Sequence, residues 1–178
     1  MAELIKLPGQ KLANRSTSAA GRSQYLAFSS GGETFAIDIR SVREVIQYGG
    51  LTEVPLMPSF IRGVINLRGS VVPVIDLSLR LGRTGTEVAR RTCVVILEVP
   101  AAEGMAVVGV VVDTVNEVLE IGPEDIDPAP AFGHDVRAEF ISGVGKVTGR
   151  FVILLNVQHV LSVQEMAALA GGREAAES

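Results

Sequence analysis

One pattern of glycines and aliphatic residues occurs twice in this chain. Residues 60–82 read FIRGVINLRGSVVPVIDLSLRLG, and residues 140–162 read FISGVGKVTGRFVILLNVQHVLS. Upstream of each, FAIDIRSVREVI at 35–46 aligns without gaps with VGVVVDTVNEVL at 108–119. The blocks keep their order, and only the connection between them is longer in the second copy, as expected because loops tolerate insertions better than cores do. The sequence therefore predicts a duplicated unit that forms two similar small barrels.

Short runs rich in Val and Ile, bounded by turn-forming residues, occupy most of the chain between its ends. The runs that predict strands are QYLAFSS, ETFAIDI, FIRGVINL, SVVPVIDL, TCVVILEV, MAVVGVVV, FISGVGKV and RFVILLNV. Strands of this number and spacing are typical of an all-β barrel or sandwich. A helix is predicted only near the C-terminus, in residues 156–171, where Val157, Val160, Leu161, Met166 and Leu169 recur with near-helical spacing.

Two kinds of glycine recur in both copies. Gly69 and Gly149 separate two strand-like runs, where a tight hairpin turn requires positive φ. Gly63 and Gly143 instead lie inside strand-like runs. A glycine in that place permits a β-bulge or the close approach of another backbone. We therefore expect all four to shape the barrels.

Composition narrows the possible partners. The 178 residues are 47% hydrophobic and carry a formal charge of −4, and Lys and Arg are scattered, so a nucleic-acid surface is not expected. No apolar run approaches the roughly 20 residues that cross a bilayer, and the N-terminus lacks the apolar stretch of a signal peptide. These features predict a cytoplasmic protein without direct membrane insertion.

Residue patterns for catalysis or metal binding are sparse. The single cysteine, Cys93, lies in an apolar run and is expected to be buried, and neither His134 nor His159 has ligands at metal-binding spacing. The fragment GVGKVTG fails as a phosphate-binding loop because Phe140 and Val147 stand where the motif needs other residues. No G-x-S-x-G motif is present. The sequence therefore favours a binding module over an enzyme, with no cofactor and no metal.

Some positions are charged in only one copy. Arg62, Arg68 and Asp76 in the first copy stand opposite Ser142, Thr148 and Asn156 in the second. Arg68 lies in the predicted turn NLRG, where a planar guanidinium would present several donors to a partner. An ordinary solvated turn arginine is the competing interpretation, because most surface charges contribute little.

Glu44 also has two interpretations. Residues 41–44 have the S-x-x-E form of a helix capping box, and residues 114–117 repeat it as T-x-x-E. A glutamate close to Arg68 would instead orient the arginine through charge-assisted hydrogen bonds. The sequence leaves both interpretations open.

Together these segments resemble the CheW family of bacterial chemotaxis coupling proteins. The resemblance is carried by FAIDIRSVREVI, TEVPLMPSFIRGVINLRGSVVPVIDL, VGVVVDTVNEVL and ISGVGKVTGRFVILLN, and it runs from Tyr25 to Leu161. It implies two five-stranded SH3-like β-barrels with pseudo-twofold symmetry and a short C-terminal helix. The corresponding domain is expected at residues 23–163, after a flexible tail at 1–22 and before a helix end and tail at 164–178.

The resemblance also implies a function. Members of this family are non-enzymatic adaptors that join the cytoplasmic tips of chemoreceptors to the regulatory domain of the histidine kinase CheA in membrane-associated arrays. The protein-binding residues that carry over are Val42, Glu44, Gly63, Arg68, Gly109, Val115 and Val118. The alternative is a small β-barrel that binds a metabolite, or an enzyme that uses the groove between the barrels. That alternative requires a deep polar pocket, whereas an adaptor needs an open apolar groove.

Overall fold

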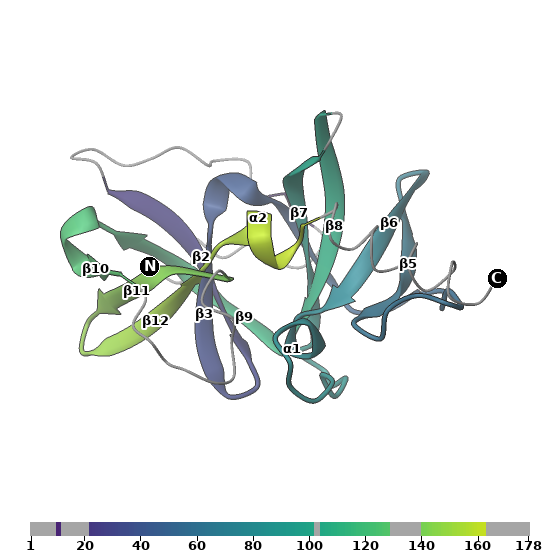
Figure 1. Cartoon of the computed structure of the whole chain (residues 1–178), viewed down its shortest axis with the longest axis horizontal. Helices are drawn as coiled ribbons and strands as arrows, with labels where there is room; N and C mark the ends of the chain where they lie inside the picture. The colour runs from purple at the N-terminus through teal and green to yellow at the C-terminus, as the bar shows by residue number, and fades with distance from the viewer. Residues whose placement is uncertain (1–9, 12–21, 102–103, 129–139, 163–178) are drawn as a thin grey trace.

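Two β-sheets stand side by side in the computed structural model, which describes residues 10–11, 22–101, 104–128 and 140–162 (Figure 1). The sheet of barrel A has the order β1 (Gln10–Lys11), β4 (Val42–Gln47), β7 (Cys93–Ala101), β8 (Gly104–Val112), β6 (Ser70–Asp76), β5 (Ile61–Leu67). The sheet of barrel B has the order β10 (Ile126–Asp127), β11 (Ile141–Val147), β12 (Arg150–Leu155), β3 (Glu33–Asp38), β2 (Ser23–Ser30), β9 (Thr114–Ile121). Each has five longer strands and one two-residue edge strand, so the predicted pair of five-stranded SH3-like barrels is confirmed.

The two copies of the sequence repeat are shared between the barrels. The block 35–46 supplies β3 to barrel B and, after the short 3₁₀ helix η3 (Ile39–Ser41), β4 to barrel A. The block 108–119 does the reverse, since it covers most of β8 in barrel A and then β9 in barrel B. Parallel pairs complete both sheets, β6 with β8 and β12 with β3. The barrels are therefore intertwined, and neither copy forms a barrel by itself.

Tight turns join the paired strands of each copy as the glycines predicted. In the β5–β6 turn Arg68 has φ 53° and Gly69 has φ 87°, and in the β11–β12 turn Thr148 has φ 41° and Gly149 has φ 76°. Positive φ at both central residues is the requirement of a type I′ hairpin turn. The phosphate-loop-like fragment is thus a hairpin.

Gly63 and Gly143 allow a second strand to approach. The pairing register shifts between Ile61 and Gly63, and again at the equivalent place before Gly143, as in a β-bulge. A Cβ atom on Gly63 would overlap the carbonyl oxygen of Thr52, and one on Gly143 would lie 2.8 Å from the carbonyl oxygen of Asp127. Both predicted reasons for these glycines are confirmed.

The core has three parts, and alternation along the strands assigns residues to them. Phe28 and Phe35, with Leu26, Ile37, Val95, Leu97 and their neighbours, fill the cluster between the barrels. The alternate positions point into the barrels, such as Ala27 and Ala36 in barrel B and Val94 and Ile96 in barrel A. Because both faces of β2, β3, β7 and β8 are covered, these strands contain nearly continuous apolar runs.

Two short helices end the copies, at equivalent positions. Helix α1 (Leu77–Arg80) follows β6, and helix α2 (Val157–Val160) follows β12 and lies between the barrels in Figure 1. The side chains of Asp76 and Asn156 cap them by accepting hydrogen bonds from backbone N–H groups. The predicted C-terminal helix is therefore present but ends at Val160; Leu161 and Ser162 are not helical, and the rest of the predicted span lies outside the described residues.

One expectation needs correction. The capping-box interpretation of Glu44 and Glu117 is wrong, because both residues lie in strands, β4 and β9. The flexible tail expected at 1–22 stays a prediction; within it, residues 10–11 form β1 and pair with β4, and the side chain of Arg22 forms an ion pair with Glu124 at 3.2 Å. Residues 1–9 and 12–21 lie outside the described part of the chain.

Candidate functional site

Glu44 and Arg68 form a two-pronged ion pair on barrel A. The Nη2 atom of Arg68 donates to Oε1 of Glu44 at 2.7 Å, and Nη1 donates to Oε2. The glutamate side chain is completely buried, whereas 53% of the arginine side chain is exposed. The hydrogen bonds and the negative charge of Glu44 raise the pKa of Arg68 above its usual range. A buried carboxylate thus fixes an exposed, permanently charged guanidinium.

The fold brings Glu44 and Arg68 together where strands from opposite ends of sheet A approach each other. Glu44 lies on β4 and Arg68 lies at the tip of the β5–β6 hairpin, toward opposite ends of the strand order of sheet A. The hairpin tip is held in place by the type I′ turn and by Asn66, whose Oδ1 accepts a hydrogen bond from the backbone N of Gly69 at 2.8 Å. The ion pair therefore closes the barrel and orients the arginine at the same time.

Barrel B contains a related pair that the sequence comparison missed. Arg150 donates from Nη2 to Oε2 of Glu117 at 2.6 Å, and both side chains are partly exposed. Arg150 is displaced by two positions from Thr148, the counterpart of Arg68, so position-by-position alignment did not reveal it. Barrel B thus also has an arginine paired with a glutamate, so such a pair is not specific to barrel A. The barrels differ in that the side chain of Glu44 is buried, whereas that of Glu117 is partly exposed.

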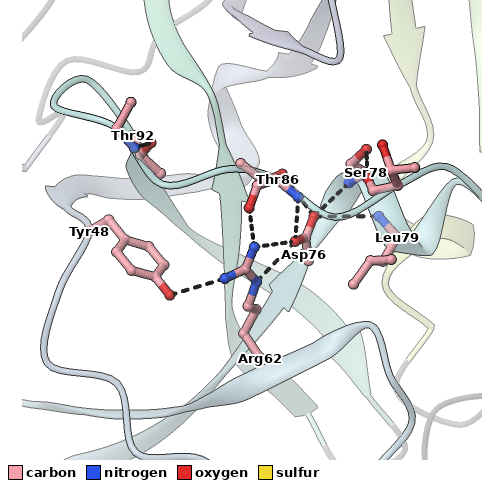
Figure 2. A network of polar contacts seen from close by, with 9 residues as sticks. Tyr48, Arg62, Asp76, Ser78, Leu79, Thr86 and Thr92 are labelled. Atoms are coloured by element: carbon pink, nitrogen blue, oxygen red, sulfur yellow. Dashed lines mark hydrogen bonds and ion pairs between the residues drawn. The ribbon is translucent and has the colours of Figure 1, made fainter.

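Arg62 and Asp76, the other charges specific to the first copy, bind each other (Figure 2). The buried carboxylate of Asp76 accepts hydrogen bonds from Arg62 Nε at 3.0 Å and from Thr86 N and Oγ1 at 2.9 and 2.8 Å. It also accepts one from the backbone N of Ser78 at 3.0 Å. This network attaches the loop before β7 to barrel A, so a structural role explains these two charges.

The remaining predicted binding residues differ in exposure. Val42 is completely buried in the cluster between the barrels, and a Cβ on Gly109 would lie 2.8 Å from Cγ1 of Val94 inside barrel A. Gly63 is buried against Thr52, whereas Val115 and Val118 are half-buried on β9. Among the described hydrogen bonds and ion pairs, Glu44–Arg68 is the contact that joins two members of the set. A binding role for the buried members stays a prediction and would act through shape.

Apolar side chains on the surface form a second feature that the sequence analysis missed. Val71 and Phe151 occupy equivalent positions after the two hairpin turns and are 72% and 68% exposed. Phe151, Val144, Ile153 and Pro128 line an open groove of roughly 680 Å³ on barrel B. Strand alternation was the available signal, since Val72 and Val152 are buried and their neighbours must point outward.

A second groove, of roughly 540 Å³, lies between the barrels. Its lining includes Asp38 and Arg40, which are joined by an ion pair of 2.8 Å. Burial raises the pKa of Asp38, but the hydrogen bonds and charge of Arg40 outweigh this effect, so the pKa lies below its usual value. An acid that stays ionised in this way has an electrostatic partner and shows no sign of adjustment for proton transfer.

Within the described residues, no group of three or more His, Cys, Asp or Glu side chains is arranged to hold a metal ion. No helix in that part of the chain is both long and apolar enough to span a bilayer.

Comparison with known proteins identifies relatives along most of the chain. The model of the CheW-like domain matches residues 24–165. The chemotaxis protein CheW of Klebsiella aerogenes is 39% identical over 144 residues, which cover 81% of this chain and 84% of that protein. Protein FrzA of Myxococcus xanthus is 34% identical over 154 residues, covering 85% and 93%.

A solved structure agrees with these matches. The crystal structure of the scaffolding protein TtCheW from Thermoanaerobacter tengcongensis superposes with a TM-score of 0.72 at 30% identity. The match covers 80% of this chain and 94% of that one. Sequence and fold therefore indicate the same family.

Proposed function

The chain belongs to the CheW family of chemotaxis scaffolding proteins, and we propose that it couples chemoreceptor tips to the regulatory domain of the histidine kinase CheA. In this role it is an adaptor with no reaction of its own. Because receptor tips lie in the cytoplasm, it acts there, recruited to receptor arrays at the membrane. Its mechanism is geometric, since control passes from one partner to the other through their common binding to one scaffold.

The observation that carries the proposal is the fixed guanidinium of Arg68. An exposed arginine on a hairpin tip normally samples many rotamers, and a partner that binds it must overcome that entropy. Here the buried carboxylate of Glu44 holds the side chain in one orientation through two hydrogen bonds. A planar donor fixed in this way suits recognition of a carboxylate or a backbone carbonyl with defined register.

The apolar surface supports the same proposal. The groove on barrel B is open and lined mostly by apolar side chains, with Phe151 exposed at its edge. Open apolar grooves accept protein surfaces, whereas small molecules are usually bound in enclosed pockets. Charged recognition on barrel A and apolar recognition on barrel B give one molecule two different faces, as an adaptor requires.

Binding assays with the full chain test the proposal. Purified receptor signalling tips and the CheA regulatory domain are added separately and together, and the fraction bound is measured by calorimetry or co-sedimentation. We expect binding to each partner alone and a ternary complex when both are present. Binding to neither partner would overturn the proposed function.

The substitution Arg68→Ala tests whether the fixed guanidinium of Arg68 contributes to partner binding. We expect affinity for at least one partner to fall about 30-fold, as for an arginine at the centre of an interface. The unfolding midpoint should also fall, because the buried carboxylate of Glu44 loses its two hydrogen bonds from Arg68, so binding is compared at a temperature where each variant is fully folded. Arg150→Ala is the matched control, since it removes the hairpin arginine of the other copy. Equal loss of binding in both variants would contradict the assignment of Arg68.

A further inference from the structure

Arg80 lies between the two barrels at the centre of the pseudo-symmetry. Its guanidinium carbon is 5.1 Å from the ring centre of Phe60 and 4.9 Å from that of Phe140. These phenylalanines are equivalent residues of the two copies, and their carbonyl oxygens accept equivalent hydrogen bonds from the backbone N–H groups of Asp76 and Asn156. Arg80 is therefore held between two matching rings, one from each barrel.

The polar contacts of Arg80 cross to the other copy. Its Nε donates to the carbonyl oxygen of Val160 at 2.6 Å, and its Nη2 donates to that of His159 at 3.4 Å. Val160 is the counterpart of Arg80 in the repeat, eighty positions along the chain. A residue that contacts its own counterpart lies on the pseudo-twofold axis, so there is room for one such arginine, and the second copy has valine.

The contacts of Arg80 are directional, in contrast to the apolar packing that surrounds them. Arg80 is only 8% exposed and lies beside the apolar cluster that packs the barrels together. Apolar packing is non-directional and tolerates small rotations of one barrel against the other. Cation–π contacts and charge-assisted hydrogen bonds to α2 hold only in one arrangement. Buried groups of this kind can define a single arrangement without adding net stability.

We propose that Arg80 is a positioning residue that sets the orientation of barrel A relative to barrel B. The functional consequence of this inference rests on the proposed function. Partners bound to different barrels can influence each other only if the two barrels keep a fixed relative orientation. Loss of Arg80 then weakens coupling more than it weakens binding of either partner.

A distance measurement tests the orientation directly. Spin labels are placed at Val71→Cys on barrel A and Phe151→Cys on barrel B, because these two positions are exposed and equivalent. The chain also carries Cys93→Ala, so that its native cysteine is not labelled. The chain with Arg80 should give one narrow distance distribution. Arg80→Met, which keeps the volume and loses the directional contacts, should give a distribution at least about twofold broader.

Two companion variants make the result decisive. Arg22→Met removes an ion-paired arginine within barrel B and should leave the distribution narrow. Arg80→Lys keeps the charge without the planar donor and should also broaden it. The proposal is overturned if Arg80→Met gives the parental distribution, or if both Arg80 variants lose cooperative unfolding, which would assign Arg80 to general stability.

The functional consequence has its own readout. With Arg80→Met we expect each binary affinity to stay within about threefold of the parental value while receptor control of CheA autophosphorylation is lost. Retained control would overturn the coupling part of the proposal. If the unaltered chain binds neither partner, the proposed function fails, and the label distances still decide whether Arg80 orients the barrels.

Discussion

Asp76 and Asn156 stand at the same place in the two copies and cap the same short helix. Asp76 has additional partners, because Arg62 and Thr86 both donate to its buried carboxylate. Asn156 is uncharged, and its Oδ1 atom accepts the hydrogen bonds that cap α2. The same residue position thus serves helix capping in both copies and loop attachment in only one.

Asp76→Ala should lower the free energy of unfolding by about 3 kcal/mol, because it removes the partner of a partly buried arginine and four other hydrogen bonds. Asn156→Ala removes only a helix cap and should lower it by about 1 kcal/mol. Urea unfolding followed by circular dichroism measures both. A loss at Asp76 no greater than that at Asn156 would contradict the network's importance.

Cys93 predicts a pH dependence. Burial raises the pKa of its thiol, and a backbone hydrogen bond from Val115 and the charge of Arg91 offset this only in part. The folded-state pKa therefore lies above the unfolded-state value, so the contribution to stability is complete below the unfolded pKa and is lost as pH rises through the folded one. Unfolding free energy should fall above about pH 8.5.

Cys93→Ala provides the control for this pH effect. Its unfolding free energy should fall less steeply between neutral and alkaline pH than that of the parental chain, because the other titrating groups are shared. Urea titrations at several pH values compare the two slopes. Parallel curves would show that Cys93 does not cause the alkaline loss.

At the scale of elements, the bulged strand and its neighbour form a repeated device. Thr52 and Val64 exchange two backbone hydrogen bonds of 2.8 Å in barrel A, next to Gly63. In barrel B, β10 pairs with β11 beside Gly143 in the same way. The missing side chain of each glycine lets the crossing segment close the barrel at that point.

Gly63→Ala should lower the unfolding free energy by about 2 kcal/mol, because its methyl group would meet backbone atoms of Thr52 that cannot move without breaking those bonds. Gly143→Ala should have a similar effect through Asp127. Gly69→Ala is the comparison, since open space surrounds it and only its positive φ is unfavourable, at about 1 kcal/mol. Chemical denaturation ranks the three variants. A milder effect at Gly63 than at Gly69 would contradict the close-approach explanation.

At the scale of the molecule, the barrels depend on each other. Strands of both barrels contribute to the cluster between them, for example Phe28 and Phe35 from barrel B and Val95 and Leu97 from barrel A. Separation would expose one apolar face of each of these strands to water. From β2 to β12 the chain also crosses between the barrels twice, after β3 and after β8.

The full chain should therefore unfold in one cooperative transition in urea, with circular dichroism and amide exchange in the two barrels reporting the same midpoint. The fragment 42–112 contains the five longer strands of barrel A but should not fold alone, because the apolar inter-barrel face of β7 and β8 would lose its cover. Two separate transitions, or a folded fragment, would contradict this interdependence.

The sequence by itself determined the strand-rich fold, the duplication, the hairpin turns and the role of the buried glycines, because strand alternation and backbone conformation depend on nearby residues. It also located Arg68 in its turn through the NLRG pattern, and the family resemblance then named it as a binding residue. The capping-box pattern misled at Glu44, because sheet pairing overrode a weak local preference.

Tertiary structure alone decided which residues meet. The pairing of Glu44 with Arg68, of Arg62 with Asp76 and of Arg80 with Phe60 and Phe140 joins positions that are far apart in the sequence. The division of each copy between two barrels was likewise invisible in the repeat. Such contacts depend on how strands exchange between sheets, and local sequence patterns carry no information about that exchange because burial and partner choice are properties of the assembled core.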